Sequence, residues 1–213
     1  MKPDETLPAR SRKKELLRAE LMITGLRMFE QQGFEQTTVQ QIADAVGVSR
    51  RTFHRHFPSK EHIVFAYQSS LFGGALDYFA RRPLDESALT AMRRAMRDYL
   101  LDPTAAAERA RMAEAARQAN RIMAANPTVR GADSAGQAQR QRVLAERIAA
   151  RTGLPAADLA PQLLAATFLV AVRVGVERWI QTADHTPATL QRALDEAFGV
   201  LQRGVDIPGR APD

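Results

Sequence analysis

Cysteine is absent from the 213-residue chain, and aromatic residues make up only 6% of it. The lack of thiols excludes disulfide bonds, a thiolate nucleophile and a zinc site built on cysteine. It also agrees with a reducing, cytoplasmic location. No run of about 18 apolar residues occurs, so we expect no membrane span. The N-terminal residues lack the apolar segment of a secretory signal peptide, which again favours the cytoplasm.

Sequence motifs of enzymes and of nucleotide sites are absent as well. The chain contains no GxSxG, no P-loop and no GxGxxG. His54 and His56 lie two residues apart on an expected helix, so they point in different directions and do not form a metal-binding pair. We therefore expect no enzymatic activity, no cofactor and no bound metal.

The positive charge is concentrated near the N-terminus. The net charge is +6; residues 1–60 carry 11 Lys and Arg against 7 Asp and Glu, whereas residues 61–213 carry 19 against 17. This distribution indicates a polyanionic partner, with nucleic acid as the first candidate. An anionic membrane surface is the less favoured alternative.

Two short helices joined by a tight turn are predicted for residues 37–60, TTVQQIADAVGVSRRTFHRHFPSK. Thr38 is placed to cap the first helix, and Gln41, three residues later, completes a capping box. Gly47 supplies the positive φ that ends this helix, and Ser49 is placed to cap the second. Two helices joined by a short turn with glycine form a helix-turn-helix unit.

The second of these helices has an apolar side and a cationic side. At 100° per residue, Phe53 and Phe57 lie together and face the core, while Arg51 and Arg55 lie opposite. A DNA major groove admits such a helix, and arginine can bind the O6 and N7 atoms of guanine. The alternative is a solvated basic helix with no partner. The helix-turn-helix context favours DNA.

This segment resembles the DNA-binding domain of the tetracycline-repressor (TetR) family, and the similarity extends over about Leu16–Lys60. In that family the second helix lies in the major groove. Thr38 and Lys60 match positions that contact phosphate, and His54 occupies a position where the family often has tyrosine. The resemblance implies that DNA is bound by Thr38, Ser49, Arg50, Arg51, Thr52, His54, Arg55 and Lys60.

No strand-like alternation occurs, so the chain is predicted to be all-α. We expect an N-terminal three-helix helix-turn-helix DNA-binding domain and a C-terminal helical bundle for ligand binding and dimerisation. The expected segments are a disordered arm over 1–10, the DNA-binding domain over 11–58, the bundle over 59–205 and a flexible tail over 206–213. Outside the helix-turn-helix, helices are expected at 11–32, 59–81, 86–101, 104–125, 127–152, 156–181 and 187–204.

Two helices of this scheme carry specific expectations. The first helix is expected to bury a stripe formed by Ala19, Met22, Ile23, Leu26 and Phe29. The helix over 59–81 contains Gly73 and Gly74, which reduce helix propensity. This glycine pair is interpreted either as a flexible point or as a site of close helix packing.

The last two helices are expected to form the dimer interface. Apolar residues between Leu163 and Ile180 cover more than one face, which predicts a helix buried nearly all round. In the TetR family the last two helices pair with those of a second subunit, so the resemblance implies a homodimer. The alternative is that both helices belong only to the core of their own subunit.

A small-molecule pocket is expected between helices of the C-terminal bundle. Arg173 lies on an apolar stripe, where it would either meet an acidic ligand or pair with Glu177 one turn away. The candidate lining residues are Phe72, Leu76, Phe79, Met96, Tyr99, Met112, Phe168, Val172, Arg173 and Trp179.

These observations favour a ligand-responsive DNA-binding transcriptional regulator, acting as a repressor that a small-molecule effector releases from a palindromic operator. Its expected partners are a double-stranded DNA operator, a second copy of the chain and an unknown small-molecule effector. Two alternatives are a DNA-binding protein without a small-molecule effector and an enzyme built on a helical bundle. The enzyme interpretation lacks any residue that can be assigned a catalytic role.

Overall fold

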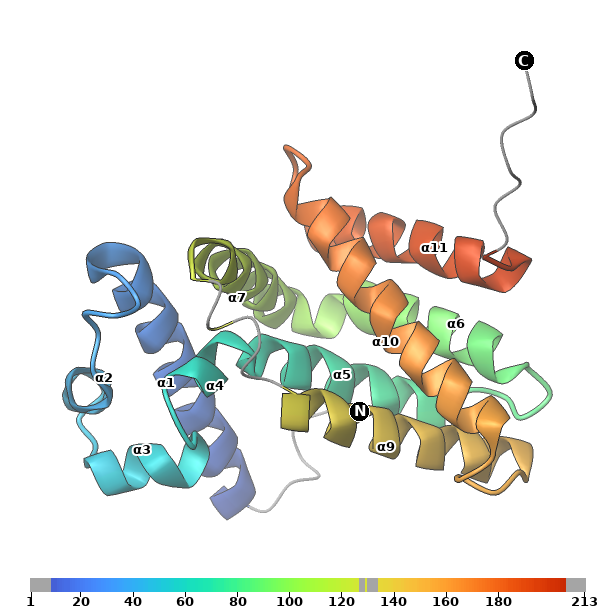
Figure 1. The fold of residues 1–213 in the computed structure, drawn as a ribbon, viewed down its shortest axis with the longest axis horizontal. Coiled ribbons are helices and arrows are strands. Elements are labelled where there is room, and N and C mark those ends of the chain that lie inside the picture. The colour runs from blue at the N-terminus through green and yellow to red at the C-terminus, as the bar shows by residue number, and fades with distance from the viewer. Residues whose placement is uncertain (1–8, 127–128, 130–133, 206–213) are drawn as a thin grey trace. The chain divides into compact units, whose positions relative to one another are not determined.

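All regular structure in the described part of the chain is helical (Figure 1), which confirms the all-α prediction. The computed structural model describes residues 9–126, 129 and 134–205. Most of the expected arm, the expected tail and part of the segment between 127 and 133 lie outside these residues. The elements are α1 (Ala9–Gln32), α2 (Val39–Ala45), α3 (Arg50–His56), α4 (Glu61–Val64), α5 (Ala66–Ala80), α6 (Ala88–Leu101), η1 (Pro103–Ala105), α7 (Ala106–Ala125), α9 (Ser134–Thr152), α10 (Leu159–Ile180) and α11 (Pro187–Arg203).

The chain divides into two compact units. The first unit contains α1 to α4, the first part of α5, η1 and α7, and the second contains the rest of α5, α6, most of α9, α10 and α11. The boundary inside α5 falls between Gly73 and Gly74. Helix α7 therefore groups with the helix-turn-helix, whereas the sequence suggested a boundary at residue 59. The expected domain limits stay a prediction.

In the first unit, α1 packs against α2, α4 and α7. The predicted buried stripe of α1 was partly wrong, because Ala19 and Ile23 are exposed while Leu21 is fully buried. The buried face is centred near Gly25, where α1 comes so close to α4 that an added Cβ would lie 2.7 Å from Cδ1 of Ile63. The buried positions of this face are Leu21, Met22, Gly25, Leu26 and Phe29.

The helix expected over 59–81 is interrupted at Phe65, which separates α4 from α5. The backbone N–H of Phe65 donates to the carbonyl of Ile63 instead of continuing the α-helical pattern, and its side chain is buried. The two glycines of α5 differ in their surroundings. A Cβ on Gly73 would meet nothing within 4 Å, whereas a Cβ on Gly74 would overlap the ring of Tyr99. Close packing therefore accounts for Gly74.

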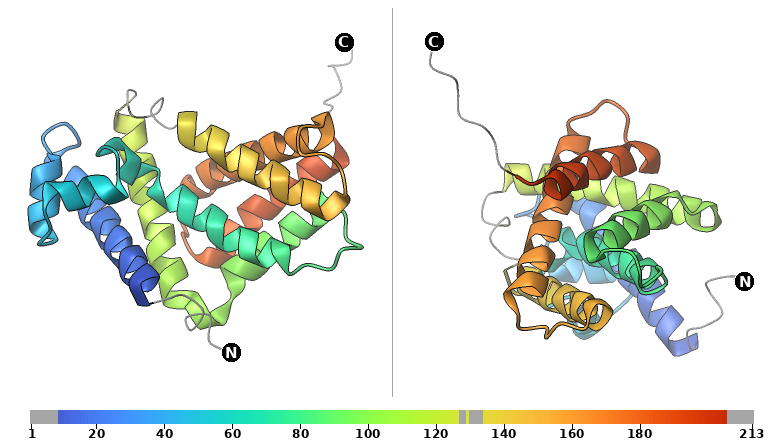
Figure 2. Two further views of the ribbon diagram at one scale, coloured as in Figure 1. Left: turned by 90° about the horizontal axis from the view of Figure 1, so that it is seen from below. Right: turned by 90° about the vertical axis from the view of Figure 1, so that its right-hand side faces the viewer.

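In the second unit, α11 packs against both α10 and α6, and Figure 2 shows α10 and α11 side by side. The rings of Phe168 and Phe198 stack with centroids 4.6 Å apart. Arg93 donates from Nε and Nη2 to the two carboxylate oxygens of Asp195, at 2.6 and 2.7 Å. These hydrogen bonds join α6 to α11 and hold the pKa of Asp195 below its usual value.

One side of α10 is exposed in the single chain, so burial nearly all round would require a second copy of the chain and stays a prediction. Its exposed apolar residues are Leu159, Leu163, Val170 and Val174. By length and composition alone, α10 could also cross a membrane. That criterion is weak, because core helices of soluble proteins meet it too. Hydropathy alone does not show which apolar faces of α10 the chain itself covers.

Substitutions of Gly73 and Gly74 test whether these glycines serve close helix packing or helix flexibility. Gly73→Ala should raise the free energy of unfolding by about 0.5–1 kcal/mol, because alanine loses less backbone entropy in a helix. Gly74→Ala should lower it by about 1–3 kcal/mol, since the new methyl group must displace Tyr99. Urea unfolding of the two variants measures both effects. Equal shifts in the two variants would contradict the close-packing explanation.

Candidate nucleic-acid interface

The helix-turn-helix forms as the sequence predicts, with side-chain caps at both helix starts. Gln41 N donates to Thr38 Oγ1 at 3.2 Å, and Thr38 N donates to Gln41 Oε1 at 2.8 Å, which completes the capping box. Gly47 has a φ of 72°, in the left-handed region that favours glycine. Ser49 Oγ accepts from the backbone N–H of Thr52 at 3.1 Å. These local bonds fix the angle at which α3 leaves the turn.

Helix α3 separates its apolar and polar side chains as predicted. Phe53 and Phe57 are buried, with ring centroids 5.8 Å apart. Thr52 is half-buried. The exposed polar residues of α3 are Arg50, Arg51, His54 and Arg55. A short helix with a buried aromatic side therefore presents three arginines to solvent.

The ammonium group of Lys60 contacts the turn between α1 and α2. Its Nζ donates to the carbonyls of Phe34 at 2.7 Å, Glu35 at 3.3 Å and Thr37 at 3.2 Å. It also lies 4.4 Å from the centroid of the Phe34 ring. Lys60 thus ties the chain after α3 to the residues that precede the Thr38 cap. The phosphate contact expected of Lys60 stays a prediction.

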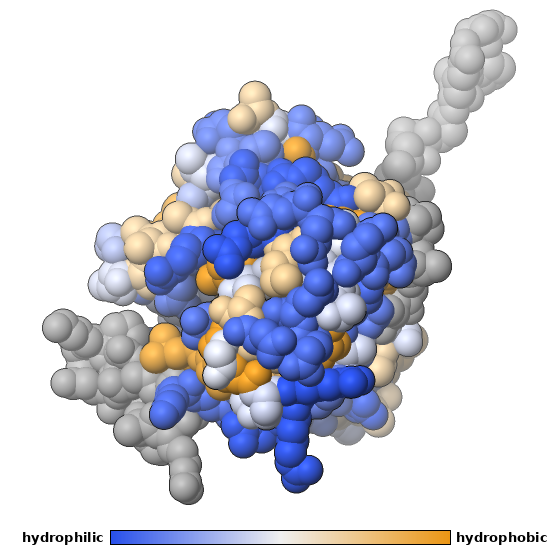
Figure 3. Space-filling model, turned by 90° about the vertical axis from the view of Figure 1, so that its left-hand side faces the viewer, coloured by the Kyte–Doolittle hydropathy of each residue, from blue (hydrophilic) through white to orange (hydrophobic). Residues whose placement is uncertain are grey.

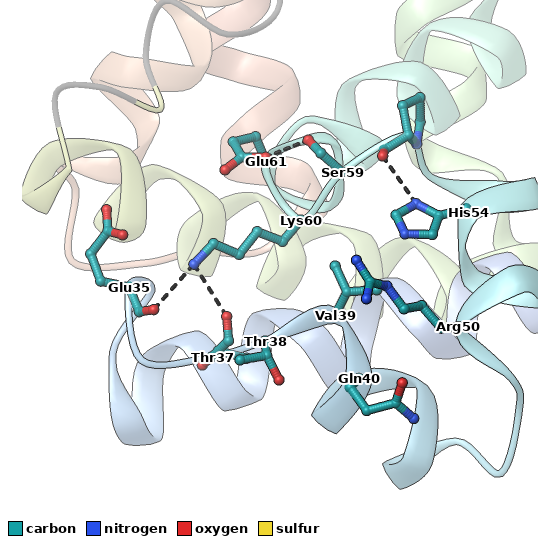
Figure 4. A pocket seen from close by; sticks show the side chains of 11 residues that line it. Glu35, Thr37, Thr38, Val39, Gln40, Arg50, His54, Ser59, Lys60 and Glu61 are labelled. Carbon is teal, nitrogen blue, oxygen red and sulfur yellow. Dashed lines mark hydrogen bonds between the residues drawn. The ribbon is translucent and has the colours of Figure 1, made fainter.

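Four of the predicted DNA-binding residues line one open hollow of about 460 Å³. Thr38, Arg50, His54 and Lys60 converge there from the N-cap of α2, from α3 and from the segment that precedes α4 (Figure 4). The ring of His54 is within hydrogen-bonding distance of the Pro58 carbonyl, at 3.1 Å. Gln40 lines the same hollow and was missed from the sequence, although it follows the cap by only two residues.

The other predicted residues lie outside this hollow. Arg51 and Arg55 project from the exposed side of α3, and Ser49 and Thr52 are occupied with capping. Figure 3, which views the molecule from the left-hand side of Figure 1, shows mainly hydrophilic residues with small hydrophobic patches. The arrangement suits a polar, charged ligand surface rather than an apolar one.

The carboxyl end of α3 contacts an arginine of α1 that sequence reasoning did not select. Arg18 Nη1 donates to the carbonyl of His56 at 2.5 Å, and the Arg18 guanidinium lies 4.3 Å from the centroid of the Phe57 ring. Arg18 lies three residues before the buried Leu21 and four before the buried Met22, which places it toward the core side of α1. This spacing is the sequence signal that could have identified Arg18 as a structural residue.

His56 is buried next to Arg18, with 7% of its surface exposed. Neither of its ring nitrogens has a hydrogen-bond partner among the described residues. Burial lowers the pKa of His56, and the charges of Arg55, Arg18 and Lys14 lower it further, while Glu15 opposes them. The neutral imidazole is thus the form that α3 accommodates.

The residues expected to line a ligand pocket in the C-terminal half differ in how far they are buried. Arg173 is exposed and donates to Glu177 Oε1 at 3.0 Å, so in the single chain it forms the helical ion pair. Phe79, Met96, Tyr99, Phe168 and Trp179 are buried, and Phe72, Leu76, Met112 and Val172 are half-buried. Phe72 and Met112 belong to the first unit and the others to the second. Their contact with a ligand stays a prediction.

Within the described ranges, no three His, Asp or Glu side chains lie close enough together to hold a metal ion. What the geometry offers is a capped, anchored helix with exposed guanidinium groups. These features define the class of protein: a helix-turn-helix protein that binds DNA.

Comparisons with known proteins narrow this class. The model of the family "Bacterial regulatory proteins, tetR family" matches residues 21–67, and that of the "MftR C-terminal domain" matches residues 86–206. The chain is 32% identical to the HTH-type transcriptional regulator TcmR of Streptomyces glaucescens, over 95% of this chain and 90% of that protein. It is 28% identical to the protein of Mycobacterium tuberculosis named as mycofactocin biosynthesis transcriptional regulator MftR, over 85% and 87% of the two chains.

A crystal structure of a TetR-family transcriptional regulator from Rhodococcus sp. shares the fold. It aligns with a TM-score of 0.53 and 18% identity, over 87% of this chain and 98% of that chain. The chain belongs to the TetR family and is a DNA-binding transcriptional regulator. Its relatives are named as regulators, which confirms the expectation that it is not an enzyme.

The buried His56 predicts acid sensitivity of the DNA-binding unit. Its folded pKa lies below the ordinary 6.5, so the unfolded chain takes up a proton first as the pH falls. The free energy of unfolding should therefore be level above about pH 7 and decrease below about pH 6.5. His56→Phe should reduce this decrease. Thermal unfolding of both proteins between about pH 7.5 and pH 5.5 tests the idea. An identical decrease in the variant would contradict it.

Proposed function

We propose that the chain is a homodimeric cytoplasmic repressor that binds a palindromic operator through α3 and leaves it when a small molecule binds the C-terminal helices. The observation that carries this proposal is the anchored α3, which buries Phe53 and Phe57 and exposes Arg50, Arg51 and Arg55. In a major groove, such arginines bind base edges and phosphates.

The proposed division of work follows the positions of the side chains. Arg51 and Arg55 are assigned to base edges because they point directly away from the buried side of α3. Thr38 and Arg50, which line the hollow with His54, are assigned to the phosphate backbone. Lys60 contributes positive charge beside Thr38, and a direct phosphate contact requires it to release a backbone carbonyl.

The exposed apolar side of α10 supports the dimer. Leu163, Val170 and Val174 recur at helical spacing, and Val200 adds an exposed apolar residue on the adjacent α11. Exposed apolar residues aligned along one side of a helix are unfavourable in water and mark an interaction site. A second copy that covers α10 and α11 would form a four-helix interface. A two-fold dimer would also present two α3 helices to two half-sites.

Effector control is assigned to the helices of the second unit. Helix α5 belongs to both units, so a ligand that changes the packing of its second part acts on a helix that continues toward the DNA-binding elements. Thermodynamic linkage then requires ligand and operator to weaken each other by the same factor. The alternative, DNA binding without an effector, predicts no thermal shift with metabolite extracts at any operator concentration.

The reading face of α3 is tested by Arg51→Ala and Arg55→Ala. Each should lower the affinity for a palindrome selected from random DNA by about 10- to 100-fold, because a bidentate contact to guanine is lost. Arg27→Ala, which removes the same charge from an exposed position of α1, is the control. Fluorescence anisotropy at fixed salt measures the effect. Unchanged affinity in both α3 variants would show that this face does not read the operator.

The dimer interface is tested by Val170→Asp, which places a carboxylate on the exposed side of α10. The variant should sediment as a monomer, since burying an unpaired charge between two helices is costly. Its operator affinity should fall by at least about tenfold, because the two half-sites then bind independently. The control is Leu84→Asp, which places the same charge on an exposed apolar residue outside α10. This variant should remain dimeric. A dimeric Val170→Asp protein would place the interface elsewhere.

A further inference from the structure

Helix α3 is too short to hold its own direction. It has seven residues, and isolated helices of that length are unstable in water. Its start is fixed by the Ser49 cap, but its last carbonyl groups have no partner within the helix. The orientation of the reading face therefore depends on what holds the carboxyl end.

Arg18 of α1 provides that contact with two different groups. Its Nη1 donates to the His56 carbonyl at 2.5 Å, and its guanidinium lies 4.3 Å from the centroid of the buried Phe57 ring. The cation also meets the partial negative charge at the carboxyl end of a helix. One side chain thus holds both the last turn of α3 and the aromatic residue that anchors it.

The environment of Arg18 differs from that of a solvated surface arginine. The side chain is half-buried on α1, and burial lowers its pKa while Glu15 opposes that effect. A guanidinium stays charged in proteins, so the cost of its burial has to be offset by the carbonyl and the ring. Phe57 leaves the helix with extended backbone angles, φ −137° and ψ 121°. Arg18 therefore contacts the chain where it changes direction.

We propose that Arg18 is a positioning residue for operator recognition: it sets the direction of α3 from α1 and thereby determines sequence specificity without itself reading DNA. This inference rests on the proposed function of α3. Phe53 anchors the middle of the helix, so loss of the Arg18 contact frees the carboxyl end first. Arg55 and His54, near that end, would move more than Arg50.

The expected consequence separates specific from non-specific binding. Bidentate contacts between arginine and guanine need a fixed geometry, and a displacement of about 1 Å at the site is enough to weaken them. Attraction to phosphates depends on charge and tolerates such a shift. A positioning role therefore predicts loss of discrimination between the operator and other duplexes, rather than uniform loss of affinity.

The experiment compares Arg18→Gln and Arg18→Lys with the matched control Arg27→Gln. Arg27 lies nine residues further along α1, on its opposite side, and is exposed. Affinities for the selected operator and for a scrambled duplex are measured at several salt concentrations by anisotropy, well below each unfolding midpoint. Amide hydrogen exchange of α3 in the free protein is measured in parallel.

For Arg18→Gln we expect a loss of at least about tenfold for the operator and no more than about twofold for the scrambled duplex, with an unchanged salt slope. The amides at the end of α3 should exchange faster than in wild type. Arg18→Lys should fail to restore discrimination, because an ammonium group does not reproduce the stacked, planar contact. The Arg27→Gln protein should discriminate like wild type.

Three results would overturn the inference. Equal losses on both duplexes with a salt slope reduced by about 1 would identify Arg18 as a phosphate contact. Wild-type discrimination in Arg18→Lys would show that charge alone suffices, and wild-type discrimination in Arg18→Gln would show that the contact is dispensable. If Arg18→Gln does not fold, the discrimination measured for Arg18→Lys still tests the inference. A wild-type protein that binds no duplex selectively would instead refute the proposed function.

Discussion

The burial of Phe53 and Phe57 is the constraint on which the DNA-binding unit depends. A seven-residue helix gains too little from its own hydrogen bonds to persist, so its stability comes from these two rings. Once they face the core, helical geometry leaves Arg51 and Arg55 no direction but outward. The same packing that stabilises α3 therefore produces its cationic surface, and recognition needs no additional structural device to expose the arginines.

Two cations hold the ends of the helix-turn-helix in a similar way. Lys60 donates to carbonyls just before the Thr38 cap and lies over the Phe34 ring, and Arg18 donates to the last carbonyl of α3 and lies over the Phe57 ring. The distances to the two ring centroids are 4.4 and 4.3 Å. The basic excess of the first 60 residues is thus partly structural, although each of these cations still adds to the positive potential near DNA.

Local signals were read correctly from the sequence, and long-range contacts were not. The caps at Thr38 and Ser49 and the orientation of Phe53 depend on residues a few positions apart, so spacing alone reveals them. Arg18 and His56 are 38 residues apart, and no local sequence pattern indicates that they are in contact. The break at Phe65 was also missed, because no glycine or proline marks that position, and Phe65 is buried.

The exposed side of α10 shows a second limit of sequence reasoning and also carries information. Hydropathy counts apolar residues. It does not distinguish residues that are buried within a single chain from residues that become buried only in contact with a second copy. Here Phe168, Val176 and Trp179 meet the chain's own core, while Leu163, Val170 and Val174 remain in water. A helix with two apolar sides and only one covered is the arrangement that a partner stabilises. Because two-fold symmetry would duplicate α3 as well, the same surface that removes apolar area from water would also double the DNA contacts.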